Sequence, residues 1–76
     1  MTIDDEIREH LERLGVVPML GGLIPEPVCA ELLGYAPSYL RRLAAAKQSP
    51  LPFVRRGNRR FYKLDDIRRF VTEPAE

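Results

Sequence analysis

The sequence predicts one small, mainly α-helical domain with a single β-hairpin. Apolar residues recur at the three- and four-residue spacing of amphipathic helices in four segments, the first of them Ile3–Leu14. Between Leu51 and Lys63 the period changes to two around Gly57-Asn58, which is typical of a tight hairpin. A chain of 76 residues is also too short for a second domain, so one thin core must serve all these elements.

The first helix is expected over Ile3–Leu14, with Thr2 as its N-cap and Gly15 as its stop. One stripe of the helix is apolar and carries Ile3, Ile7, Leu11 and Leu14. Glycines and prolines then predict a linker, with a short extended piece at Val16-Val17. The four expected parts are an acidic accessory helix, a linker, the main domain and a tail, at residues 1–15, 16–24, 25–72 and 73–76.

Two short helices joined by a tight turn should open the main domain. The first is expected over Pro25–Gly34, with Cys29, Leu32 and Leu33 facing inward. Pro37 begins the second helix, which is expected to run to about Lys47. Its inward residues are Leu40, Leu43 and Ala44, and its opposite side carries Ser38, Arg41, Arg42 and Ala45.

The hairpin and a last helix complete the main domain. A two-residue loop at Gly57-Asn58 sets the pairing of the two strands. The expected partners are Arg56 with Arg59, Arg55 with Arg60, Val54 with Phe61, and Phe53 with Tyr62. Four arginines therefore flank the tip, and like charges in opposite positions destabilise an isolated hairpin, so an anionic partner is indicated. The last helix is expected over Leu64–Val71.

Positive charge is concentrated in the middle of the sequence, although the net charge is only +1. Eight lysines and arginines and no acid lie between Pro37 and Lys63, whereas both ends of the chain are acidic. Such a block is the electrostatic pattern of a surface that binds a polyanion. The alternative is an arginine-rich surface that is merely solvated, but such surfaces tend to mix the two signs.

Three segments of this domain resemble the MerR-like winged helix-turn-helix family, most closely the phage excisionases. Ala30–Gly34 is similar to the family's first helix and turn, and Pro37–Leu43 occupies the place of its recognition helix. Leu51–Ile67 resembles its wing and closing helix, and this is the most specific of the three matches. Two positions depart from the family: Ala36 replaces the usual hydroxyl cap, and Pro27 replaces a polar residue.

The resemblance implies that the chain binds double-stranded DNA with the second helix and the hairpin. In helix-turn-helix proteins the start of the recognition helix meets base edges in the major groove, where arginine pairs with guanine. Arginines at a hairpin tip reach phosphates or a narrow minor groove. The candidate DNA-binding residues are Ser38, Tyr39, Arg41, Arg42, Lys47, Arg55, Arg56, Asn58, Arg59 and Arg60. Tyr39 could instead pack against the core, and Ser38 and Lys47 could simply be solvated.

Catalysis, metal binding and cofactor binding find no support in the sequence. His10 is the only histidine and lies in the acidic helix, and Cys29 belongs to an apolar stripe. No Cys/His cluster for zinc and no glycine-rich phosphate loop occurs. Asp65 and Asp66 are adjacent on a helix and therefore diverge. We expect a non-enzymatic protein with no cofactor and no catalytic or metal-binding residue.

The resemblance and the basic block together predict an excisionase, which bends DNA at a phage attachment region and directs an integrase towards excision. The partners are then duplex DNA, a phage integrase and neighbouring copies bound side by side, and the acidic helix could touch such a partner or only cap the core. A small transcriptional regulator or the DNA-recognition part of a packaging protein is the alternative. A protein–protein adaptor for an acidic partner is a further one. A single cysteine, an acidic N-terminal segment and no long apolar run predict a cytoplasmic, nucleoid-associated protein without a membrane segment.

Overall fold

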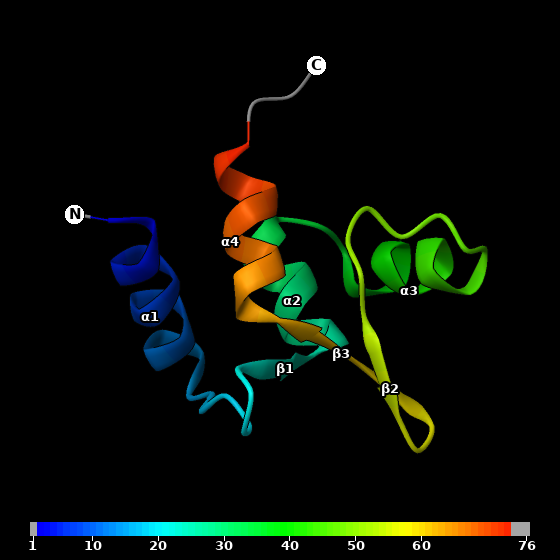
Figure 1. The fold of residues 1–76 in the computed structure, drawn as a ribbon, viewed down its shortest axis with the longest axis horizontal. Coiled ribbons are helices and arrows are strands. Elements are labelled where there is room, and N and C mark those ends of the chain that lie inside the picture. Colours follow the sequence, from blue (N-terminus) through cyan, green and yellow to red (C-terminus); the bar gives the residue numbers. More distant parts are fainter. Residues whose placement is uncertain (1, 74–76) are drawn as a thin grey trace.

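The computed structural model describes residues 2–73, which form four helices and a three-stranded antiparallel sheet (Figure 1). The molecule measures 35 × 32 × 21 Å along its principal axes. Its elements, in chain order, are α1 (Ile3–Leu14), β1 (Leu23–Pro25), α2 (Glu26–Leu33), α3 (Pro37–Ala45), β2 (Val54–Arg56), β3 (Arg59–Lys63) and α4 (Leu64–Thr72). The mainly helical fold class expected from the sequence is therefore confirmed, and the expected tail lies almost wholly outside the described residues.

Helix α1 has the predicted bounds because its capping signals are local. The Thr2 hydroxyl accepts a hydrogen bond from the Asp5 backbone, and the Asp5 side chain accepts one from the Thr2 backbone in return. Ile7 and Leu11 are buried in the common core, whereas Leu14 is 42% exposed. The accessory helix is thus packed on the main domain through the buried Ile7 and Leu11, with Ile3 partly buried against the same core.

Strand β1 is the main correction to the sequence analysis. Leu23–Pro25 falls at the boundary between the expected linker and the expected main domain, but it pairs antiparallel with β3 and makes β3 the central strand. The extended piece expected at Val16-Val17 is not a strand. A run of three residues is too short to show a period of its own, and its pairing comes from tertiary contact. Ile24 faces Tyr62 in that pairing, and both side chains are fully buried.

The predicted hairpin register is confirmed for three of its four pairs. Val54, Arg55 and Arg56 of β2 face Phe61, Arg60 and Arg59 of β3, in that order. Gly57 supplies the positive φ that the two-residue turn requires, at 63°, whereas Asn58 does not share it. Phe53 lies outside the strand, although its ring still lies 5.8 Å from the ring of Tyr62.

The two short helices meet at a turn close to the one predicted. Gly34 ends α2 in the left-handed region at φ 79°, and Pro37 begins α3. Helix α2 starts one residue later than expected, α3 ends at Ala45 rather than near Lys47, and α4 extends one residue beyond Val71. These are shifts of one or two residues at frayed helix ends.

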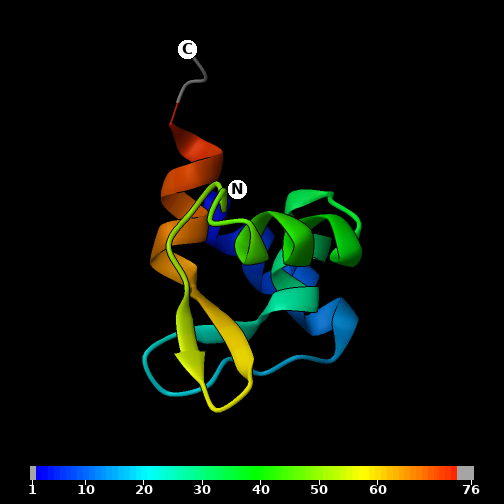
Figure 2. The same ribbon diagram turned by 90° about the vertical axis from the view of Figure 1, so that its right-hand side faces the viewer.

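One core fixes the arrangement of the elements. Its largest fully buried side chains come from the sheet and from three helices, and they are Tyr62, Ile24, Leu40, Ile67 and Cys29. Helix α1 lies on one side of this core, and α3 and the β2–β3 hairpin lie together on the other side (Figures 1 and 2). The two elements expected to contact DNA are therefore neighbours in space.

Candidate nucleic-acid interface

Helix α3 presents one polar side to solvent. Leu40 and Ala44 are buried, which turns the remaining faces of the helix outward. The exposed residues include every α3 residue that the sequence analysis selected, namely Ser38, Tyr39, Arg41 and Arg42. The core contacts of Leu40 and Ala44 therefore leave all four of these side chains available to a partner.

Tyr39 does not pack into the core; instead it connects Arg42 to a second tyrosine. Its side chain is 41% exposed, and its ring meets the ring of Tyr35 edge-on at 5.5 Å. The guanidinium carbon of Arg42 lies 5.8 Å from the centre of the Tyr39 ring. This distance is within the range of a cation–π contact, which favours positions of the Arg42 side chain close to the ring.

The hairpin arginines fall on two faces of the sheet. Directly paired residues share a face, so Arg56 and Arg59 project to one side, and Arg55 and Arg60 project to the other. Arg55, Arg56, Asn58 and Arg59 are all exposed. The tip of the hairpin thus offers three exposed guanidinium groups and one amide to solvent.

Arg60 differs from the other hairpin arginines, because a carboxylate of the protein itself engages it. Its Nη1 lies 3.6 Å from Oε1 of Glu26, and its guanidinium carbon lies 5.6 Å from the centre of the Phe53 ring. The side chain is only 23% exposed, and its Nε is buried without a hydrogen-bond partner in the described residues. Arg60 was expected to contact DNA, and in this structure its guanidinium is engaged by Glu26 and lies near the Phe53 ring.

Glu26 is the site residue that the sequence analysis missed. Its side chain is 11% exposed, and its second oxygen, Oε2, accepts a hydrogen bond of 2.8 Å from the Tyr62 hydroxyl. Burial, followed by this hydrogen bond, raises the pKa of Tyr62 well above its usual value. Glutamate at a helix start is ordinarily a solvated group that complements the helix dipole, so nothing in the local sequence distinguished this one.

A hollow joins α3 to the hairpin. It has a volume of about 380 Å³ and lies where β1 ends and β3 extends beyond it. Its lining comes from the start of α2, from α3, and from the turn and first residues of β3, and consists of Pro25, Glu26, Pro27, Arg41, Asn58, Arg59 and Arg60. Residues from α3 and the hairpin that are far apart in sequence therefore share one concave surface.

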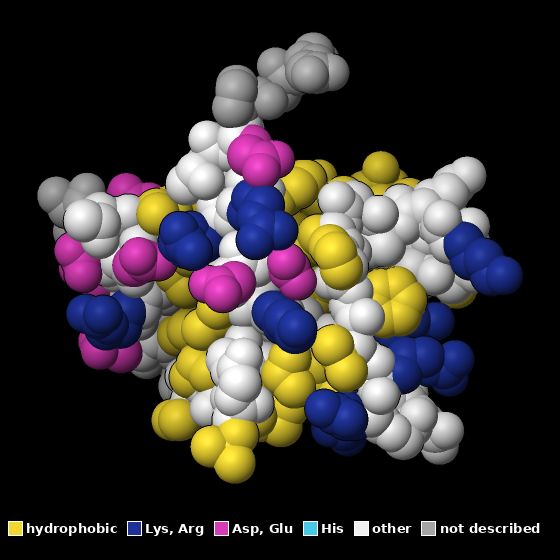
Figure 3. All heavy atoms as spheres, in the orientation of Figure 1, with side chains coloured by type: hydrophobic (Ala, Val, Ile, Leu, Met, Phe, Trp, Pro, Cys, Tyr) yellow, Lys and Arg dark blue, Asp and Glu magenta, His cyan; other side chains and the backbone are white. Residues whose placement is uncertain are grey.

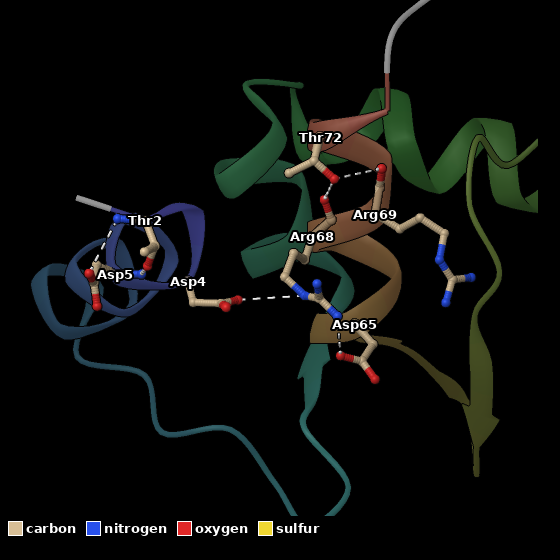
Figure 4. A network of polar contacts seen from close by, with 7 residues as sticks. All are labelled: Thr2, Asp4, Asp5, Asp65, Arg68, Arg69 and Thr72. Carbon is tan, nitrogen blue, oxygen red and sulfur yellow. Dashed lines mark hydrogen bonds and ion pairs between the residues drawn. The ribbon is translucent and has the colours of Figure 1, made fainter.

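On the face shown in Figure 3, positive charge and mixed charge occupy different sides. In Figure 3, lysine and arginine side chains on the α3 and hairpin side have no acidic neighbour on the visible face, whereas both signs mix over α1 and α4. On that mixed side Arg68 bridges Asp4 of α1 at 3.6 Å and Asp65 at 3.2 Å (Figure 4). Asp66 pairs with Arg69 instead, so the two adjacent aspartates diverge as predicted.

The lining of the hollow between α3 and the hairpin does not include Lys47, His10 or Cys29. Lys47 is exposed beyond the end of α3, in left-handed backbone at φ 59°. His10 is exposed, and Cys29 is fully buried, where burial and then the nearby Glu26 charge raise the pKa of the thiol to about 12. Within residues 2–73 no group of His, Cys, Asp or Glu side chains is arranged to hold a metal ion, and no helix could span a membrane.

A scan against protein-family models, a search of curated proteins and a search of solved structures each found no match for this chain.

Proposed function

We propose that the chain is a winged helix-turn-helix protein that binds duplex DNA with α3 and the β2–β3 hairpin. The observation that carries this proposal is the shared hollow, which brings Arg41 of α3 together with Arg59 of the hairpin. In the described part of the chain neither residue has a carboxylate partner, so their charges remain available to a polyanion.

In this proposal α3 enters the major groove, which is wide enough to admit a helix. Arg42, held against Tyr39, is the best placed residue to read a guanine, because its side chain is restricted in advance. Arg55, Arg56 and Arg59 of the hairpin follow the adjacent backbone or minor groove. Arg60 stabilises the hairpin by pairing with Glu26 and by lying against the Phe53 ring.

We further propose that this DNA binding serves excision by a phage integrase, with neighbouring copies bound side by side and the DNA bent between sites. The support is the resemblance of Leu51–Ile67 to the wing and closing helix of excisionases. A small MerR-like regulator, or the recognition module of a packaging protein, would use the same surface. An excision assay with the integrase encoded nearest to the gene separates these roles, because only an excisionase changes the direction of recombination.

Titration of the full chain with duplex DNA, followed by amide chemical shifts, tests the DNA-binding surface. We expect the largest shifts in α3 and at the hairpin tip, and small ones in α1, which lies on the opposite side. Arg13, an exposed arginine in α1, is the internal control. Shifts centred on α1, or shifts caused equally by an acidic polypeptide and by DNA, would instead indicate a protein–protein adaptor.

A further inference from the structure

Some charged side chains that line the hollow between α3 and the hairpin have ion-pair partners, and others have none in the described part of the chain. Both oxygens of Glu26 are already engaged, one by Arg60 and the other by the Tyr62 hydroxyl. The Glu26–Arg60 pair is therefore a neutral wall, and its side chains are too buried to swing out freely.

Two other arginines also line the hollow. They are Arg41 of α3 and Arg59 of β3, and no ion pair involves either residue within the described range. Asn58 adds an uncharged amide donor at the rim. A concave surface with two free guanidinium groups and an amide selects an anion that accepts several hydrogen bonds, and phosphate is the anion of this kind in DNA.

The position of the hollow agrees with this chemistry, provided that the proposed function holds. If α3 lies in the major groove and the hairpin reaches the adjacent minor groove, one sugar–phosphate strand must pass between them, since a backbone strand separates neighbouring grooves. The hollow lies between these two elements. A backbone phosphate would therefore be carried into it when both elements bind.

We propose that this hollow is a seat for a single backbone phosphate, which Arg41 and Arg59 bind together. The shared phosphate fixes the distance between the recognition helix and the wing on the DNA. Arg60 and Glu26 do not bind this phosphate directly but hold the wall of the seat in place. Two arginines from different elements thus serve one contact, rather than two independent contacts.

Methylphosphonate substitution tests this proposal, because it removes the charge of one chosen phosphate. The substrate is a short duplex selected from a randomised pool by the full-length chain. One substituted position should weaken the wild-type protein by about tenfold or more. That penalty should disappear in both Arg41→Ala and Arg59→Ala, and the double variant should bind little worse than either single one. Arg55→Ala, a hairpin arginine outside the hollow, should keep the penalty.

A second experiment uses inorganic phosphate alone and does not depend on DNA binding. The side-chain Nε resonances of Arg41 and Arg59 should shift together along one binding curve, while that of Arg55 should remain nearly unchanged. If duplex binding fails but this response persists, Arg41 and Arg59 still share one phosphate ion, and the proposed DNA function is wrong. If the two arginines map to different phosphates, or if phosphate shifts every exposed arginine equally, the shared seat is wrong.

Discussion

Arg60 and Glu26 approach to 3.6 Å between Nη1 and Oε1, across 34 positions of sequence, and this contact divides the hairpin arginines into two kinds. Arg60 is bound by the protein itself, whereas its neighbour Arg59 is exposed. Adjacent residues of a strand point to opposite faces, and Arg60 shares its face with the fully buried Tyr62. Two arginines that look equivalent in the sequence therefore lie in different environments.

Arg60→Ala and Arg59→Ala form a matched pair of substitutions that tests this division. Removing Arg60 leaves the buried Glu26 carboxylate without its cation, so the free energy of unfolding should fall by about 1–3 kcal/mol. Removing the exposed Arg59 should change stability by no more than about 0.5 kcal/mol but should weaken binding to every DNA sequence. Urea unfolding and gel-shift titrations measure the two effects. Equal losses of stability in the two variants would contradict the division.

The buried Tyr62 and Cys29 predict that the protein loses stability in alkaline solution. Burial raises the pKa of both groups, that of Cys29 from 9.0 to about 12, so the unfolded chain releases these protons at lower pH than the folded one. Stability is then fully present below the unfolded pKa values and falls as the pH rises above about 9, by up to about 1.4 kcal/mol per pH unit for each group.

Urea unfolding between about pH 8 and about pH 11 measures this loss. Cys29→Ala should make the decline shallower, because it removes one of the two titrating groups. A free energy of unfolding that stays constant over this range would show that the two side chains are accessible to solvent.

Substitutions of Leu11 and Leu14 in α1 test whether the helix packs against the core or only has an amphipathic sequence. Leu11 is 5% exposed and Leu14 is 42% exposed, although both belong to the predicted stripe. Leu11→Ala should destabilise the protein by about 2–4 kcal/mol, since it leaves a cavity between α1 and the core. Leu14→Ala should cost less than about 1 kcal/mol. Thermal or urea unfolding compares them, and similar costs would mean that α1 does not pack as described.

Much of the fold follows from local signals, and the exceptions depend on distant contacts. The Thr2 N-cap of α1 and the register around Gly57 each depend on residues a few positions apart, so the sequence predicts both. Strand β1 could not be predicted, because its pairing partner β3 lies far along the chain. The ion pair between Glu26 and Arg60 could not be predicted for the same reason, because the two residues are far apart in the sequence. Strand alternation alone did not show which face of β3 Arg60 takes, because Phe61 and Tyr62 are both apolar and both buried.

Arg42 should contribute sequence selectivity rather than general affinity. Arg42→Ala should weaken a selected site by about 1–3 kcal/mol more than random duplex if the residue reads a guanine. Tyr39→Phe keeps the ring under Arg42 and should preserve this selectivity, whereas Tyr39→Ala should lose part of it. Competition binding with selected and random duplexes measures the ratio. An equal loss on both duplexes would assign Arg42 to a phosphate.

The most direct test of DNA binding is the salt dependence of the affinity of the full chain for duplex DNA. If α3 and the hairpin together neutralise about six phosphates, the binding constant should fall roughly a thousandfold between about 50 and about 200 mM salt, linearly on logarithmic axes. An affinity that hardly changes over this range would contradict a surface built from Arg41, Arg59 and their exposed neighbours to bind the DNA backbone.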